Sequence, residues 1–185
     1  MSNRTGTYVA FDGLGEKDPT KSDLKYYSDL QAWKENQNIE FNFINSHDKT
    51  SAVQDSSSKE TLHRTIQERL RMSKNVLIIL TSDTRKTGST LSYEIEQAID
   101  VYKLPLIIAY PEHSTILDVN DALTNIWPEA LVKRIDNSDI EAIHIAFKKE
   151  CIFDAIKRFS VNGEHLQSGK EHYLRADYLK WGLIK

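Results

Sequence analysis

The sequence lacks the features that mark secreted and membrane proteins. It contains one cysteine, Cys151, in 185 residues, so no internal disulfide can form. Residues 1–7 are polar and lack the apolar segment that a signal peptide requires. The longest apolar runs, such as residues 76–80 and 104–110, are far shorter than the roughly 20 residues of a membrane-spanning helix. We therefore expect a cytoplasmic protein that is not embedded in a membrane.

The sequence also lacks a strong excess of one charge. Its net charge is −3, and acidic and basic residues are scattered along the whole chain. This distribution provides no electrostatic footprint for nucleic acid or an anionic membrane, so a small molecule or a protein is the expected partner. A G-x-G-x-x-G phosphate loop is missing, which argues against a hydride-transferring Rossmann enzyme. The histidines show no recognised metal-ligand spacing, and we assign no metal site.

Apolar patterns predict an alternation of strands and helices. Buried or alternating runs predict strands at residues 7–11, 39–44, 75–81 and 104–110. Apolar residues at helical spacing predict helices at residues 24–36, 58–72 and 91–102. This order requires right-handed crossovers, and it predicts a flavodoxin-like, doubly wound parallel sheet of about five strands with helices on both faces.

The pattern weakens after residue 110. We predict an edge strand at residues 130–135 and a helix from Ser138 to about Ser160. Residues 1–160 are then one α/β domain. Residues 161–185 are predicted to be a linker and a short helix that packs on the domain or on a partner.

Ligands of open parallel sheets bind outside the carboxyl ends of the strands. The loops that follow residues 11, 44 and 81 carry Asp12, Asp48 and Ser82. Glu94 lies in the early turns of the helix after the third of these strands. We therefore expect these side chains near the site.

Three segments together carry a family resemblance. Residues 7–12, residues 75–81 and above all Leu91-Ser-Tyr-Glu-Ile-Glu-Gln-Ala98 resemble the Toll/interleukin-1 receptor (TIR)-like family of bacterial defence systems, notably the TIR proteins of Thoeris anti-phage systems. In that family an aromatic residue, a glutamate and an aliphatic residue open the third helix, and Tyr93-Glu94-Ile95 matches this motif. The resemblance covers residues 7–112.

The resemblance implies an enzyme that cleaves the nicotinamide glycosidic bond of NAD+ with Glu94 as the catalytic carboxylate. NAD+ is then the substrate, and no cofactor is required. Phe11 and Asp12 are candidates to line the nicotinamide-ribose pocket, and Tyr93 is a further substrate-binding candidate. Asp48 and Ser82 are candidates to bind hydroxyls or to order the loops. Implied partners are further copies of the chain, through TIR–TIR contacts, and a downstream effector that senses the nucleotide product.

The implied chemistry suits a carboxylate. Nicotinamide leaves as a neutral group, so the barrier lies in the positive charge that develops on the ribose, which a carboxylate can stabilise or capture. Whether the ADP-ribose product is released, cyclised or joined to an acceptor stays open. The sequence departs from many TIR proteins in having Phe11-Asp12-Gly13 after the first strand, and Leu91-Ser92 where a Trp often precedes the glutamate.

Three other interpretations remain. Glu94 can be a helix N-terminal acid that the helix dipole favours. The chain can be a non-catalytic TIR module that binds partners through helix faces or through the region of Tyr178 and Trp181. It can also be a phospho-receiver, with Asp83 as the acceptor after the third strand and Asp12 after the first.

Overall fold

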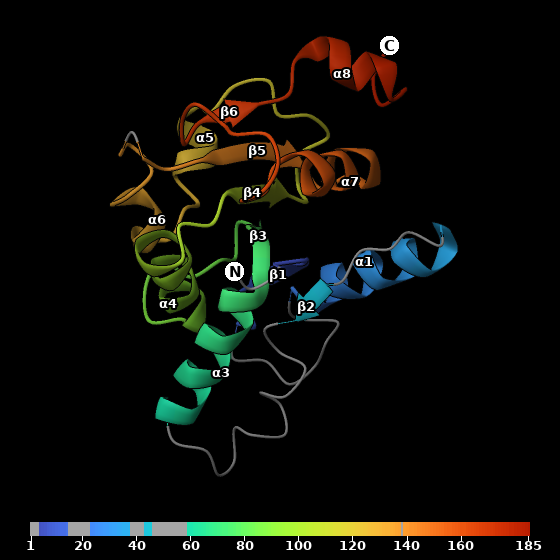
Figure 1. Ribbon diagram of the computed structural model, residues 1–185. Coiled ribbons are helices and arrows are strands. Elements are labelled where there is room, and N and C mark those ends of the chain that lie inside the picture. Colours follow the sequence, from blue (N-terminus) through green and yellow to red (C-terminus); the bar gives the residue numbers. More distant parts are fainter. Residues whose placement is uncertain (1–3, 15–22, 38–42, 46–58, 138) are drawn as a thin grey trace.

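A computed structural model describes residues 4–14, 23–37, 43–45, 59–137 and 139–185 (Figure 1). Its centre is a sheet of six strands in the order β2-β1-β3-β4-β5-β6, and every neighbouring pair is parallel. The strands are β1 (Gly6–Phe11), β2 (Phe43–Asn45), β3 (Ser73–Ile79), β4 (Leu106–Tyr110), β5 (Ala142–Ala146) and β6 (Glu171–His172).

Helices cover both faces of this sheet. They are α1 (Leu24–Gln37), α3 (Lys59–Met72), α4 (Thr90–Glu96) with its π-helical continuation η2 (Gln97–Val101), α5 (Asp121–Thr124), α6 (Glu129–Val132), α7 (Lys149–Arg158) and α8 (Arg175–Lys180). In Figure 1, α3, α4 and α6 lie on one side of the sheet and α1 and α7 on the other. Each side buries its own apolar cluster. The predicted doubly wound α/β class is confirmed, with a two-residue sixth strand added at the edge.

Alternation along β1 assigns each of its side chains to one face. Tyr8 and Ala10 belong to the cluster under α3 and α4, whereas Val9 and Phe11 belong to the cluster under α1 and α7. Because side chains on a strand alternate between the two faces, the register of β1 decides which of them can reach α4. Tyr8 lies on that side, and Phe11 does not.

The elements predicted between residues 7 and 110 are confirmed where the structure describes them, while residues 39–42 of the predicted second strand lie outside the described residues. The strand predicted at residues 130–135 is wrong, because a short helix, α6, begins there at Glu129. Pro128 precedes it with a φ of −59°, which suits the entry to a helix.

The long helix predicted from Ser138 to Ser160 is also wrong in its first half. Residues 142–146 form β5, and only residues 149–158 form a helix, α7. Ile140, Ile143 and Phe147 do fall at helical spacing, but β5 is buried along its whole length and pairs with β4 and β6. Periodicity alone does not separate a short, fully buried strand from a buried helical segment.

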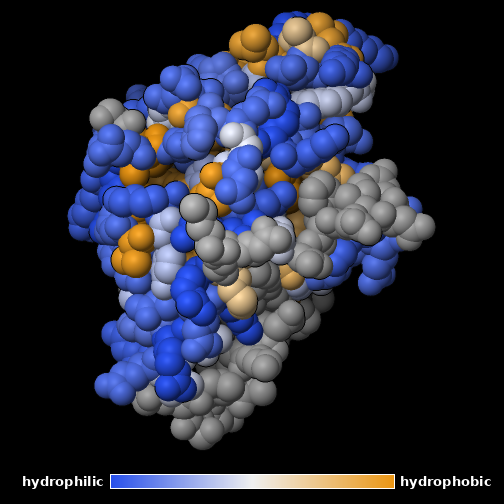
Figure 2. Space-filling view, in the orientation of Figure 1, coloured by the Kyte–Doolittle hydropathy of each residue, from blue (hydrophilic) through white to orange (hydrophobic). Residues whose placement is uncertain are grey.

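The C-terminal residues extend the fold beyond the predicted helix. The strand β6 pairs with β5, and Tyr178 of α8 is fully buried, with its hydroxyl 3.0 Å from the Ile116 backbone nitrogen that donates to it. Leu174 and Leu179 stay exposed in this region, and apolar side chains gather there at the top of Figure 2. No helix in the described part of the chain combines the length and apolarity needed to cross a membrane.

A buried polar network joins β4, β5 and the turn before α6. Trp127 Nε1 donates to the Tyr110 hydroxyl (2.8 Å), and this hydroxyl lies 2.7 Å from His144 Nδ1. The other ring nitrogen of His144, Nε2, lies 2.9 Å from the Gly169 carbonyl oxygen, which can only accept, so Nε2 carries the proton and Nδ1 accepts from Tyr110. Burial lowers the pKa of His144 to about 4, so the ring is neutral at pH 7.

We predict that His144 makes the fold sensitive to acid. The unfolded histidine titrates near pH 6.5, and the folded one near 4. The unfolded state therefore takes up the proton first as the pH falls, and stability is lost between these values. As the pH falls from 7 to 4, the wild type should lose about 3 kcal/mol more of its unfolding free energy than His144→Gln does. Urea denaturation of both proteins across this pH range measures the difference between their unfolding free energies. The titration of groups that both proteins share cancels in this difference. An unchanged gap in unfolding free energy between the wild type and His144→Gln across this range would refute the prediction.

Candidate functional site

The loop from residue 81 to residue 89, here called the edge loop, crosses the carboxyl edge of the sheet between β3 and α4. Its strongest attachment is to Asp12, which directly follows β1. The Arg85 guanidinium forms an ion pair with Asp12 at 2.6 Å and adds an Nε hydrogen bond at 2.9 Å, while the Arg85 backbone N–H donates at 3.0 Å. Asp12 is 1% exposed, so this pair seals a buried carboxylate against the loop.

The surroundings of Asp12 also include a second buried acid, Asp23. Burial opposes ionisation of Asp12, but hydrogen bonds from Arg85 and from the Leu14 backbone outweigh it and lower the pKa of Asp12. Burial raises the pKa of Asp23 to about 6, and the negative charge of Asp12 adds to the effect. The Thr81 hydroxyl donates a hydrogen bond to the Asp23 carboxyl at 3.4 Å. The surroundings therefore lower the pKa of one of the two carboxyls and raise the pKa of the other.

Further contacts fasten the rest of the edge loop. The Ser82 hydroxyl donates to Glu112 in the segment after β4, at 2.7 Å. The Lys86 carbonyl accepts from the Glu129 backbone N–H at 3.0 Å, and the Lys86 ammonium donates to the Trp127 carbonyl at 3.3 Å. The loop is thus fixed to the segments that follow β1 and β4 and to the start of α6.

Glu94 lies one turn into α4, on the face that packs on the sheet. It is 2% exposed, and its Oε1 accepts a hydrogen bond of 2.6 Å from the Tyr8 hydroxyl. Glu96, only two residues further on, points to a different side of the helix and is 44% exposed near Arg134. The helix therefore buries one glutamate and leaves the next one half exposed.

Two aromatic residues of the predicted site, Phe11 and Tyr93, have their contacts away from Glu94. Phe11 faces the opposite side of the sheet, where it stacks on Tyr27 with ring centroids 6.3 Å apart. Tyr93 turns toward α3, stacks on His63 at 3.7 Å and accepts a hydrogen bond from Gln67.

The polar members of the predicted set have separate positions. Asp12 and Ser82 both contact other side chains at the sheet edge, through Arg85 and Glu112 respectively. Asp48 lies outside the described residues. Among the residues that the structure does describe, no group of three or more His, Cys, Asp or Glu side chains is placed to hold a metal ion.

Sequence reasoning missed Tyr8 and Arg85. Tyr8 had a usable signal, because it is the one side chain of β1 with a polar group on the α4 side of the sheet, and Glu94 occupies the buried face of α4. Arg85 had none, since an arginine in a polar loop resembles any solvated cation until the fold brings it to Asp12.

The parallel α/β sheet with helices on both faces is the fold of a TIR-like domain. A protein-family comparison matches residues 8–116 to the TIR-like domain of the Thoeris protein ThsB. This match spans more than half of the chain, and the protein belongs to this family. Membership supports a place among TIR-like proteins of anti-phage defence.

We predict that Arg85→Gln destabilises the protein by about 1–3 kcal/mol, because it leaves the buried Asp12 carboxylate without its cation. The double variant Asp12→Asn/Arg85→Gln should lose less than the sum of the two single losses. Chemical denaturation of the four proteins gives the coupling energy.

The matched control is the pair of Arg134 and Asp100, whose side chains are 22% and 48% exposed. The same cycle there should give a coupling below about 1 kcal/mol. Equal coupling energies in the two cycles would contradict the argument from burial.

Proposed function

We propose that this protein cleaves the nicotinamide glycosidic bond of NAD+ as part of anti-phage defence, with Glu94 as the catalytic carboxylate. The observation that carries the proposal is the burial of Glu94 on the inner face of α4 with its Oε1 held by Tyr8. Both residues fall within the segment that matches the ThsB family. The Tyr8 hydrogen bond fixes the orientation of the Glu94 side chain.

The chemistry requires little else from the protein. Departure of neutral nicotinamide leaves positive charge on the ribose, and a carboxylate beside the ribose stabilises that charge or bonds to it. Tyr8 is a positioning residue in this scheme, because its hydroxyl donates to Glu94 and orients that side chain. Hydrolysis and cyclisation both start from this step and differ in whether water or another atom of the ADP-ribosyl group attacks.

Access to Glu94 is part of the proposal. A carboxylate that is 2% exposed does not contact a dinucleotide, so catalysis requires a rearrangement that uncovers it. Assembly of several copies, as the TIR resemblance implies, is one source of such a change. Activity that rises more steeply than protein concentration would be its signature.

We predict that Glu94→Gln abolishes NAD+ loss while the fold is kept, because the side chain keeps its size and loses its charge. Chromatography with mass spectrometry, on high concentrations of protein incubated with NAD+ and infected-cell extract, measures nicotinamide and the ADP-ribose-derived product. The matched control is Glu96→Gln, which makes the same change two residues away on an exposed position and should retain wild-type turnover. Wild-type turnover by Glu94→Gln would remove Glu94 from catalysis. Silence of the wild type in every condition would favour a binding module.

We also predict that Tyr8→Phe lowers kcat by about 10- to 100-fold with little change in KM. A hydrogen bond to a charged group contributes about 1.5–3 kcal/mol, and here it orients the carboxylate without touching substrate. Steady-state kinetics separates the two parameters. A pure rise in KM would instead place Tyr8 in substrate binding.

A further inference from the structure

The Arg85–Asp12 ion pair lies on the same side of β1 as Glu94 and nearer the carboxyl edge of the sheet. Tyr8 and Ala10 project from β1 toward α4, and the same alternation places Asp12, which directly follows the strand, on their side. Glu94 is hydrogen-bonded to Tyr8, four residues before Asp12. The side chain of Arg85 is 45% exposed and that of Asp12 is 1% exposed. The pair therefore stands between the solvent at the sheet edge and the interior that holds Glu94.

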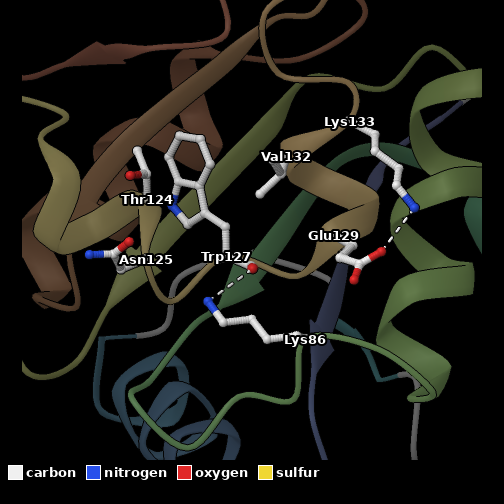
Figure 3. Close-up of a pocket in the computed structure, with 7 residues that line it drawn as sticks. All are labelled: Lys86, Thr124, Asn125, Trp127, Glu129, Val132 and Lys133. Carbon is white, nitrogen blue, oxygen red and sulfur yellow. Dashed lines mark hydrogen bonds and ion pairs between the residues drawn. The ribbon is translucent and has the colours of Figure 1, made fainter.

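Arg85 attaches the edge loop to the end of β1. Two side-chain nitrogens and the backbone N–H of Arg85 all donate to the carboxylate of Asp12. Other attachments of the loop run in other directions, because Ser82 binds the segment after β4 and the Lys86 ammonium donates to the Trp127 carbonyl before α6 (Figure 3). Loss of the Arg85–Asp12 contact would thus separate the loop from β1 while these other attachments remain.

The junction between the edge loop and α4 is not fastened by a helix cap. Ser89 occupies the N-cap position of α4, where a serine ordinarily accepts a hydrogen bond from the first turn, but its side chain makes no such bond. Its Oγ is buried, and no atom in the described part of the chain is hydrogen-bonded to it. A buried hydroxyl without a partner is costly, and water would satisfy it once the loop moved away. The unsatisfied hydroxyl therefore opposes the closed position of the loop, and the ion pair retains it.

We propose that the Arg85–Asp12 pair, here called the latch, is an autoinhibitory contact. While it is formed, the edge loop shields Glu94, and its opening exposes Glu94 at the carboxyl edge of the sheet. The structure holds the closed state, in which Glu94 is 2% exposed. Opening then supplies the rearrangement that a buried catalytic carboxylate needs. The consequence for turnover rests on the proposed function, whereas the change in exposure of Glu94 does not.

Carboxyl labelling with a carbodiimide and glycine ethyl ester tests the latch without NAD+. Glu94 and Glu96 lie in one tryptic peptide, residues 87–103, so tandem mass spectrometry compares a buried and a half-exposed glutamate in the same molecule. We expect Glu94 of the wild type to react more slowly than Glu96. Arg85→Gln should raise the Glu94-to-Glu96 labelling ratio about tenfold or more, because it removes charged hydrogen bonds. Arg85→Lys, which keeps the positive charge, should restore most of the protection.

Two further variants make this result specific. Asp12→Asn breaks the latch from its other side and should also expose Glu94. The matched control is Arg158→Gln, which removes an arginine from its ion pairs on α7, at the other face of the sheet, and should leave Glu94 protected. Hydrogen exchange of the β4 amides, which should stay slow in every variant, separates opening of the latch from global unfolding. A Glu94 that stays protected in Arg85→Gln, or that is labelled equally in Arg158→Gln, would overturn the proposal.

Loss of NAD+ separates the latch from the proposed function. At a protein concentration at which the wild type turns over slowly, Arg85→Gln should cleave NAD+ about tenfold faster, and adding Glu94→Gln should abolish this gain. Exposure of Glu94 without NAD+ loss in any variant would support the latch and remove the proposed function. NAD+ loss by the wild type, with Glu94 still protected in Arg85→Gln, would remove the latch and leave the proposed function standing.

Discussion

The burial of the central strands on both faces is the constraint on which the rest of the structure depends. All residues of β1 and β4 are buried, as are six of the seven residues of β3, so helices must cover both sides of the sheet. Parallel strands covered in this way need a helix in each crossover, and all their carboxyl ends meet at one edge. The edge loop and the start of α4 are therefore brought to the same place as the end of β1.

Polar contacts then hold the edge loop in one conformation at this edge of the sheet. The edge loop is held by an ion pair to Asp12, by Ser82 to Glu112 and by Lys86 to the turn before α6. These contacts join segments far apart in the sequence, and each is made by a side chain that follows a buried strand or precedes a helix. The apolar core thus fixes the positions, and the charged pairs fix the loop conformation.

Sequence reasoning recovered the sheet up to residue 110 because its strands and helices have distinct apolar periods. It failed at β5, where a short buried run and helical spacing coincide, and at α6, where Pro128 and Glu129 start a helix too short to show a period. At the site, the sequence showed the motif around Glu94, but it did not show toward which element the neighbouring side chains point. Phe11 and Tyr93 adjoin the right segments, yet strand alternation turns one to the opposite face and helix rotation turns the other toward α3.

The position of Glu94 is difficult to explain by stability alone. An acid in the first turn of a helix contributes about 0.3–1 kcal/mol, but the first turn of α4 holds no acid and Glu94 lies beyond it. Removing a carboxylate from water costs several kcal/mol before any partner repays it. Tyr8 offsets part of that cost with a short hydrogen bond, but an apolar residue at this buried position would incur no such cost. An acid retained there at the expense of stability fits a group that is kept for its chemistry and not for the fold.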